Sequence, residues 1–301
     1  MAICGLGIDL NSITVEDVAR ILSSVGYVAD KRIATAVFLA IRLEKPLLVE
    51  GEPGCGKTEL AKALAEGLGT ELIRLQCYEG LDASKALYEW DYPRQLIAIR
   101  LLERFAKPEE IEREIYSEKY LLKRPLLRAA TSDSEKPPVL LIDEVDRADE
   151  EFEALLLEFL SEFQITVPEI GTIKASKKPI VILTSNRTRE VGDGLRRRCL
   201  YLYLSYPERE RELEILRRKV PGISEKLANE VVDAVRLIRS IDGVVKKPGI
   251  SETIEWARAL KEMGFTELSI EAVRNTLSVV LKLPEDIEKV DIEGLVSKVK
   301  R

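Results

Sequence analysis

A short glycine-rich stretch constrains the fold of this chain more than any other feature. Residues 51–58 read Gly-Glu-Pro-Gly-Cys-Gly-Lys-Thr and fit the pattern G-x-x-x-x-G-K-[ST]. An apolar run at 46–50 precedes the stretch, and a run of helical character at 59–65 follows it. Glycines let backbone N–H groups curve around an anion, and a helix that starts just after them adds a favourable dipole. Strand, loop and helix in this order predict a site for nucleotide phosphates.

Each position of this loop has an expected task. Lys57 can reach the β- and γ-phosphates, and the hydroxyl of Thr58 can ligate Mg²⁺. Gly56 is expected where a side chain would collide with phosphate. We therefore predict ATP and Mg²⁺ as cofactors. The candidate nucleotide-binding residues are Gly51, Glu52, Pro53, Gly54, Cys55, Gly56, Lys57, Thr58 and Glu59.

The bulk composition excludes several other classes of function. The chain has no histidine, which rules out His-based catalytic triads and His-ligated metals. Its four cysteines, at 4, 55, 77 and 199, form no C-x-x-C pair, so neither a zinc knuckle nor a redox motif is expected. No apolar run approaches the ~20 residues that span a membrane, and no signal peptide is recognised. A formal charge of −6 argues against general affinity for nucleic acid. A cytoplasmic protein with reduced thiols is expected.

Apolar runs that alternate with helical segments predict a doubly wound α/β fold with about five parallel strands. Beside the strand before the loop, runs at 71–77, 139–144, 179–186 and 200–204 are expected strands. Helices are expected at 13–26, with Thr14 as N-cap, at 31–43, with Asp30 as N-cap, and at 150–163. An aromatic-rich loop is expected at 78–93, a charged helical stretch interrupted by Pro108 at 95–118, and a β-hairpin at 164–173.

The composition changes at Tyr206-Pro207, and from there only helices are expected. Their predicted ranges are 208–219, 224–240, 251–263, 269–281 and 285–298. We therefore predict a nucleotide-binding domain over 1–205, in which 1–29 is a helical extension, and an all-α lid domain over 206–301.

Two carboxylates end the apolar run at 139–142. Asp143 is expected to hold Mg²⁺, directly or through water, and Glu144 to polarise the water that attacks the γ-phosphate. The alternative is a strand that merely ends in solvated acids. A carboxylate at this place favours hydrolysis over a GTPase-type switch, which usually orients water with Gln.

Polar and basic residues follow the next two strands. Asn186 is expected to orient the attacking water or to contact the γ-phosphate, with turn formation as the alternative. Arg196, Arg197 and Arg198 precede the fifth strand. An arginine supplied to the γ-phosphate of a neighbouring subunit accelerates phosphoryl transfer. We expect Arg198, and after it Arg197, in this role; a solvated basic cluster is the alternative.

Taken together, residues 51–58, 140–144, 184–186 and 196–199, followed by a helical region, resemble an AAA+ ATPase. Residues 86–90 and 122–127 resemble the MoxR branch more narrowly, and within it the CoxD-like subgroup. The resemblance implies a ring, usually a hexamer, with ATP at the subunit interfaces. It also implies a chaperone-like remodeller that matures another protein, often with a partner that carries a von Willebrand factor A domain. By the same resemblance Asn186 matches the residue called sensor 1, and Arg198 matches the arginine finger.

The resemblance leaves three points open. Related proteins often place an arginine, sensor 2, at the start of a lid helix; here Thr253 occupies that place and Arg258 lies farther along. Tyr78, Tyr88, Trp90 and Tyr92 either belong to a central loop that touches a substrate or pack in the core. A nucleic-acid motor or clamp-loader-like ATPase is the first alternative function, kept open by the Arg-Cys pair at 198–199. A small-molecule kinase is the second.

Overall fold

The computed structural model describes residue 10 and residues 12–300, and these residues divide into two compact units. Unit 1 consists of the described residues up to Ile21 together with Asp30–Glu50 and Ala61–Leu202. Unit 2 consists of Leu22–Ala29, Gly51–Leu60 and the described residues from Tyr203 onward. The glycine-rich loop thus belongs to the same unit as the C-terminal helices.

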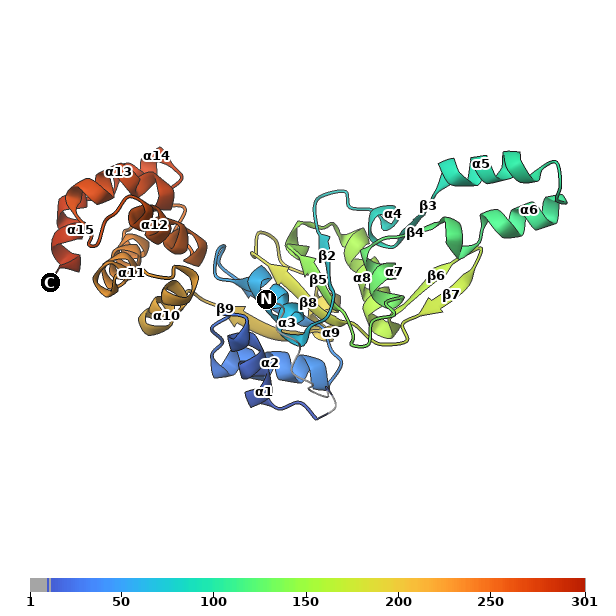
Figure 1. Cartoon of the computed structure of the whole chain (residues 1–301), viewed down its shortest axis with the longest axis horizontal. Helices are drawn as coiled ribbons and strands as arrows, with labels where there is room; N and C mark the ends of the chain where they lie inside the picture. Colours follow the sequence, from blue (N-terminus) through green and yellow to red (C-terminus); the bar gives the residue numbers. More distant parts are fainter. Residues whose placement is uncertain (1–9, 11, 301) are drawn as a thin grey trace. The chain divides into compact units, whose positions relative to one another are not determined.

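A five-stranded sheet forms the core of the α/β part (Figure 1). Its order is β2-β5-β8-β1-β9, with β1 (Leu47–Gly51), β2 (Leu72–Gln76), β5 (Val139–Asp143), β8 (Ile180–Ser185) and β9 (Leu200–Leu204). The neighbours β2–β5, β5–β8 and β8–β1 pair in parallel. Every residue of β1, β5 and β8 is buried, because helices cover both faces of the sheet. The predicted P-loop-type doubly wound fold is confirmed.

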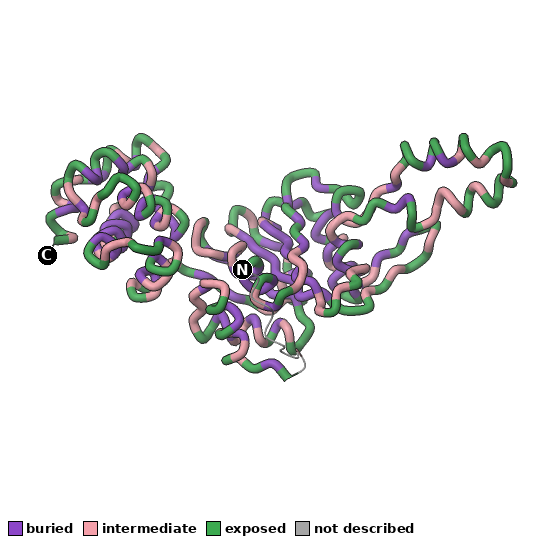
Figure 2. The backbone as a smooth tube through the Cα atoms, viewed as in Figure 1, coloured by how far each residue is buried: buried purple, intermediate pink, exposed green. Residues whose placement is uncertain are grey.

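Helices accompany the sheet, and two of them, at 125–130 and 193–198, were not predicted from the sequence. They are α1 (Val15–Ser24), α2 (Lys31–Arg42), α3 (Lys57–Leu68), α7 (Pro125–Ala130), α8 (Glu150–Glu162) and α9 (Asp193–Arg198), with 3₁₀ turns η1 (Glu118–Tyr120) and η2 (Val145–Arg147). Both predicted N-caps are confirmed. The Thr14 hydroxyl accepts from the Asp17 N–H at 3.1 Å, and the Asp30 carboxylate accepts from the Ile33 N–H at 2.9 Å. The buried backbone of the sheet and of its helices is drawn in purple in Figure 2.

Between β2 and β5 the chain leaves the sheet and forms a hairpin of two helices (Figure 1). It comprises α4 (Ala83–Ala86), β3 (Tyr88–Trp90), α5 (Tyr92–Leu102), α6 (Pro108–Ile115) and β4 (Leu121–Lys123), and β3 pairs antiparallel with β4. The expectation of a loop over 78–93 is wrong for most of that range. Asp82 and Asp91 accept from the N–H groups of Lys85 and Arg94, and these caps start α4 and α5 inside it. The predicted interruption is confirmed, since Pro108 starts α6.

The predicted β-hairpin at 164–173 is also confirmed. Strands β6 (Gln164–Val167) and β7 (Gly171–Lys174) pair antiparallel. Phe163, at the end of α8, adopts a left-handed conformation with φ of 50° and turns the chain into β6. Ile165 and Val167 of β6 are buried in the core of unit 1, whereas β7 is largely exposed.

The C-terminal part of unit 2 is all helical. Its helices are α10 (Arg209–Lys219), α11 (Glu225–Ser240), α12 (Ile250–Glu262), α13 (Ile270–Val280), α14 (Pro284–Glu288) and α15 (Ile292–Val299). The single helix predicted over 285–298 is wrong: Asp291 accepts from the Gly294 N–H at 3.0 Å and caps a separate helix. Trp256 lies fully buried among these helices and donates to the Thr276 hydroxyl at 2.7 Å. Among the described residues no helix has both the length and the apolar character needed to cross a bilayer.

Candidate functional site: the glycine-rich loop and the ends of β5, β8 and α9

The glycine-rich loop lies between β1 and α3, and two of its glycines are required for different reasons. A Cβ on Gly51 would lie 2.0 Å from the carbonyl oxygen of Leu204, so the approach of β9 requires glycine there. Gly56 has φ of 94°, a conformation that favours glycine. Among the described residues, and apart from its neighbours along the chain, Tyr27 alone lies within 4 Å of the place of a Cβ on Gly56. The expected conflict of that side chain with a phosphate stays a prediction.

Gly54 joins the loop to the start of α12. Its carbonyl accepts from the Ile250 N–H at 2.8 Å, and its φ is 73°. A Cβ on Gly249 would lie 2.7 Å from the Cα of Gly54. Two facing glycines therefore let the loop and the first turn of α12 touch backbone to backbone.

Lys57 is buried and turns back into its own loop. Its ammonium donates to the carbonyl oxygens of Gly51 at 2.7 Å and Glu52 at 2.8 Å. The positive charge of the Lys57 side chain therefore lies inside the curve of the loop. An anion bound there would gain that charge and the third N–H donor of the ammonium. The neighbouring acid of α3, Glu59, accepts from Lys219 at 2.9 Å.

A cavity of about 280 Å³ lies beside the loop within unit 2. Its lining combines apolar and polar side chains, as expected for a site that binds a ring and charged groups together. The apolar lining consists of Tyr27, Val28, Ile215, Ile250 and Ile254; the polar lining includes Glu59, Arg211, Lys219, Glu255 and Arg258; and Gly54, Cys55 and Gly56 form the loop side.

The structure separates the two sensor 2 candidates. Thr253 is buried, and its hydroxyl lies 2.9 Å from the Gly249 carbonyl and 3.1 Å from the Glu212 carboxylate. Arg239 donates to the same carboxylate through two nitrogens, which makes this cluster part of the helical core. Arg258 lines the cavity and donates to the Lys219 carbonyl at 3.0 Å. Arg258 is therefore our candidate for contact with a bound nucleotide.

We expect Arg258→Ala to weaken ATP binding by about tenfold or more, since a hydrogen bond to a charged group is worth about 1.5–3 kcal/mol. Its thermal stability should stay near that of the wild type. Thr253→Val is the matched control and should cost about 1 kcal/mol of stability with unchanged ATP affinity. Fluorescent-nucleotide titration and thermal unfolding measure the two effects. A reversed pattern would assign the contact to Thr253.

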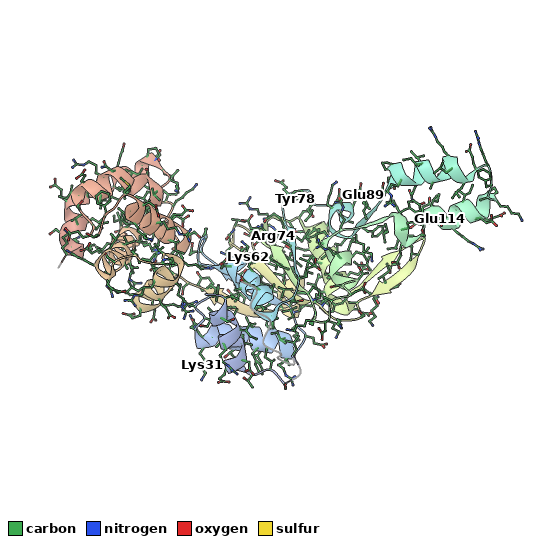
Figure 3. All side chains as sticks on the ribbon, viewed as in Figure 1. Lys31, Lys62, Arg74, Tyr78, Glu89 and Glu114 are labelled. Carbon is green, nitrogen blue, oxygen red and sulfur yellow. The ribbon has the colours of Figure 1, made fainter. Side chains whose placement is uncertain are left out.

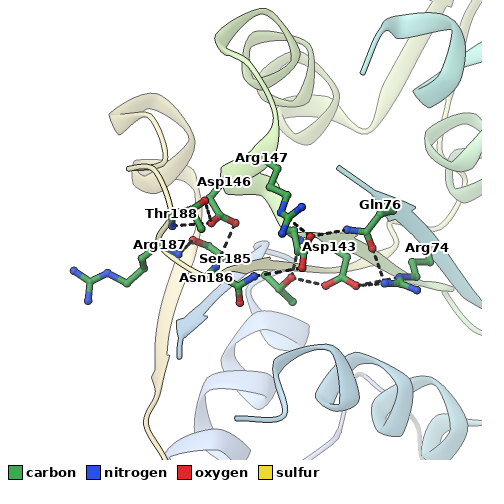
Figure 4. Close-up of polar contacts among 11 residues, drawn as sticks. Arg74, Gln76, Asp143, Asp146, Arg147, Ser185, Asn186, Arg187 and Thr188 are labelled. Carbon is green, nitrogen blue, oxygen red and sulfur yellow. Dashed lines mark hydrogen bonds and ion pairs between the residues drawn. The ribbon is translucent and has the colours of Figure 1, made fainter. Parts of the chain in front are cut away.

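Asp143 ends β5 in a buried, fully engaged position (Figure 4). One carboxylate oxygen accepts from the Thr184 hydroxyl at 2.6 Å, and the other accepts from Arg74 Nε at 3.0 Å. Arg74 comes from β2 and also donates to Gln76. A hydroxyl and a guanidinium therefore fix the Asp143 carboxylate at the carboxyl edge of the sheet.

Glu144 follows in a left-handed conformation, with φ of 57° and ψ of 49°. This backbone is uncommon for a residue other than glycine and clusters at functional sites. Its carboxylate accepts from Gln76 Nε2 at 3.1 Å and from Arg147 Nε at 2.9 Å, while Asn186 Nδ2 lies 3.4 Å away (Figure 4). The Glu144 N–H donates to the Thr184 hydroxyl at 2.9 Å. The structure thus brings Glu144 together with Asn186, as a paired carboxylate and amide.

The backbone around Asn186 is held by a second carboxylate. Asp146 is buried and accepts from the N–H of Asn186 at 3.2 Å, the N–H of Thr188 at 2.9 Å and the Thr188 hydroxyl at 2.6 Å. Asp146 therefore fixes the backbone of the turn at Asn186, while the Asn186 side chain stays directed at Glu144; its role at the site stays a prediction.

The three arginines at α9 divide into one anchored and two exposed residues. Arg196 donates to the buried Glu50 carboxylate at 2.7 Å, and the Tyr201 hydroxyl donates to the same carboxylate at 3.0 Å. Arg197 and Arg198 are exposed, and Arg198 donates to the Ser161 hydroxyl on α8. Arg196 thus fixes α9 to β1, and the other two remain the candidates for a neighbouring subunit.

The described cysteines are free thiols with raised pKa values. Burial raises the pKa of Cys77 and of Cys199 to about 12. Burial also raises the pKa of Cys55, although Lys57 opposes the shift. All three therefore stay protonated near neutral pH. The prediction for Cys4 lies outside the described residues.

The four aromatic residues after β2 have different surroundings. Trp90 is buried and packs edge-to-face on Tyr116, with ring centroids 5.4 Å apart. Tyr88 is half-buried, whereas Tyr78 and Tyr92 are 47% and 60% exposed. The core-packing alternative is therefore correct for Trp90. Tyr78 and Tyr92 remain free of the core.

Sequence reasoning missed the residues that hold the candidate catalytic groups. Gln76 and Thr184 lie at the carboxyl ends of β2 and β8, where parallel strands bring side chains to one edge of the sheet. A polar residue at the end of an otherwise apolar strand is the available signal. Glu50 is likewise a polar residue near the end of an otherwise apolar strand, β1.

The fold and the loop define a P-loop nucleoside-triphosphatase. The model of the ATPase family associated with various cellular activities (AAA) matches residues 47–204, and the chain belongs to this family. This assignment rests on the sheet, the loop and α9 together, all of which lie within or at the ends of the matched range.

Two curated relatives each match only part of this chain. An uncharacterized AAA domain-containing protein of Schizosaccharomyces pombe is 23% identical over 194 residues, which are 62% of this chain and 21% of that protein. Midasin of Giardia intestinalis is 41% identical over 54 residues, 18% of this chain and 1% of midasin. The chain thus matches about a fifth or less of the length of these relatives. A point mutant of RuvB from Thermotoga maritima has a TM-score of 0.50 at 19% identity, covering 94% of this chain and 75% of that one, and shows the fold.

The donor groups fit a magnesium nucleotide. No group of three or more His, Cys, Asp or Glu side chains within residues 12–300 could hold a metal alone. Magnesium in nucleotide sites keeps several waters and takes one or two protein oxygens plus phosphate oxygens. Thr58 in unit 2 and Asp143 in unit 1 each carry an oxygen of that kind, and both stay predicted ligands; the glycine-rich loop has backbone N–H groups of the kind that bind phosphate.

Proposed function

We propose that the protein hydrolyses ATP to ADP and phosphate in a ring of identical subunits, most simply a hexamer, and so drives changes in another protein. The carrying observation is Glu144, which follows β5 in a left-handed backbone conformation and whose carboxylate accepts from Gln76 and Asn186. A carboxylate fixed at that edge of the sheet is suited to take a proton from water.

The proposed roles of the other residues follow from their positions. Lys57 and the backbone of Gly51–Thr58 bind the phosphates, with Glu59 at the end of the loop. Thr58 and Asp143 hold Mg²⁺, which when bound supplies positive charge to the phosphate oxygens. Asn186 orients the attacking water beside Glu144. Arg198, or Arg197 after it, stabilises the γ-phosphate of a neighbouring subunit.

We further propose a place in the MoxR branch, with residues 1–205 as the nucleotide-binding domain and 206–301 as the lid. The two segments that carry this resemblance, 86–90 and 122–127, overlap the paired strands β3 and β4. On this basis the protein is a cytoplasmic, chaperone-like remodeller that matures a protein client, with a von Willebrand factor A domain protein as its partner.

Mixing two inactive variants tests the shared site. Arg198→Ala should lower turnover by about 10³-fold, since an arginine finger is worth 10³–10⁵. Lys57→Ala should be inactive for lack of nucleotide. In mixed rings about a quarter of the interfaces join an intact loop to an intact arginine, so ATPase activity should return. Colorimetric phosphate release measures it.

The control for this mixture places both defects on one subunit. Rings of Arg198→Ala with the double variant Lys57→Ala/Arg198→Ala contain no complete interface and should stay inactive. Mixed rings verified by mass that show no recovery with the single variants would contradict an arginine acting between subunits. Tight, strongly salt-dependent DNA binding that stimulates turnover would instead favour the nucleic-acid-dependent alternative.

A further inference from the structure

The outer face of α5 exposes a row of large apolar side chains. Ile97, Leu101 and Phe105 are 59%, 66% and 87% exposed, and Leu96 beside them is 62% exposed. Their spacing of four residues places Ile97, Leu101 and Phe105 along one side of the helix and the turn that follows it. Figure 2 shows this hairpin as largely exposed backbone. Apolar rows of this kind mark interaction surfaces in soluble proteins.

The hairpin is held together by its opposite side. Gln95 is buried and donates to the Ile115 carbonyl of α6 at 2.7 Å. Ala98 is buried against the core of unit 1, and Trp90 packs on Tyr116 at the base. Figure 3 shows Glu89 at that base and Glu114 on α6, away from the outer face of α5. The exposed row is therefore not needed to hold the hairpin together.

Cations border the apolar row. Arg100 and Arg104 are exposed on the same side of α5, one turn apart. Throughout residues 12–300 neither guanidinium takes part in an ion pair or a hydrogen bond. The opposite helix differs in character: α6 exposes Glu109, Glu110 and Glu112. The exposed charge is thus mainly positive beside the apolar row and mainly negative on α6, with Glu103 after α5 and Arg113 on α6 as exposed exceptions.

We propose that the outer face of α5 docks an acidic amphipathic helix of a protein partner, and this proposal rests on the remodelling function above. Anchors at i, i+4 and i+8 match the way one helix packs on another. The unpaired guanidiniums select a partner whose apolar side is bordered by Asp or Glu. The outer face of α5 therefore implies that the protein client, or an adaptor protein bound to it, carries an acidic amphipathic helix.

Two other occupants fit the face less well. A second copy would have to offer both carboxylates and apolar groups, but the acidic side of α6 has no large exposed apolar side chain among the described residues. An anionic bilayer would contact a row only about three turns long, while helices that lie on membranes are typically longer and rich in cations throughout.

Designed peptides provide the test. The probe is a labelled 18-residue helical peptide with a leucine stripe flanked by Glu; the comparison peptides carry Lys in place of Glu, or the same residues without the stripe. We expect the acidic stripe peptide to bind at least ~10-fold more tightly than either, with loss of affinity at high salt. Fluorescence anisotropy measures the three affinities on the full chain.

Variants of α5 then assign the surface. Arg100→Glu/Arg104→Glu should reverse the preference between acidic and basic peptides. Ile97→Ser/Leu101→Ser/Phe105→Ser should weaken binding at least ~10-fold, as truncating anchor residues does. The control, Glu109→Lys/Glu112→Lys on α6, should leave the affinity unchanged. All these positions are exposed, so circular dichroism should show folded protein throughout.

Three results would overturn the proposal: peptides that bind without regard to charge, anionic phosphatidylserine vesicles that bind where the acidic peptide does not, or α5 variants that alter the oligomeric state in sedimentation. Basal ATP hydrolysis should be unchanged in the α5 variants. A wild-type protein that binds the acidic peptide but hydrolyses no ATP would sink the proposed function and leave the docking face intact.

Discussion

Glu144→Gln is expected to bind ATP normally and to turn it over at least ~100-fold more slowly, the range for losing a positioned base. The replacement keeps the size of the side chain but removes its negative charge and its ability to take a proton. Gln76, Arg147 and Asn186 all donate toward the present carboxylate, and an amide can accept from them only through its single oxygen. Single-turnover hydrolysis and nucleotide titration separate the effect on chemistry from the effect on binding.

The matched control for this variant is Glu151→Gln on α8, which removes an exposed carboxylate from the same unit. Turnover of that control should equal the wild-type rate. If Glu144→Gln hydrolysed ATP at a near-normal rate while folded, Glu144 would not be the base, and the proposed hydrolytic role of this strand end would fail.

Lys57→Ala is expected to abolish measurable ATP binding, with at least ~100-fold weaker affinity, because several charge-assisted contacts of about 1.5–3 kcal/mol each are lost. The ammonium also bonds the carbonyls of Gly51 and Glu52, so its removal takes away the cation that holds the loop curved. Isothermal titration with Mg-ATP measures the loss.

Lys62→Ala provides the control, because Lys62 is an exposed lysine on the same helix, α3 (Figure 3). It should bind ATP as the wild type does. Retained ATP affinity in Lys57→Ala, with the protein folded by thermal unfolding, would exclude the phosphate-loop assignment itself.

The sequence predicted the backbone of this fold well, for physical reasons. Strands buried on both faces are continuous apolar runs, and short polar side chains such as Asp30 mark helix starts by capping free N–H groups. The loop was predictable because glycine spacing and a following helix are local properties. The split after Glu288 was missed, since a cap such as Asp291 within a helical pattern also fits an uninterrupted helix.

The pairings at the site could not be predicted from the sequence in the same way. Arg74 and Asp143, or Glu50 and Arg196, meet only because the fold brings together elements that are far apart in the sequence. The sequence puts Thr253 at the place of sensor 2, and only the fold shows that its hydroxyl is buried against the Glu212 carboxylate. Such contacts depend on tertiary packing, which the spacing of apolar residues along the sequence does not reveal.

The backbone contact between Gly54 and the start of α12 has a thermodynamic consequence. The carbonyl that accepts from Ile250 belongs to the same loop that we propose binds the nucleotide phosphates. A ligand that favours one conformation of this loop must then favour the matching position of α12, and a force on α12 must alter the affinity for that ligand by the same free energy. The binding of a nucleotide and the position of α12 are thus coupled through one conformational equilibrium of the loop, and each changes the free energy of the other.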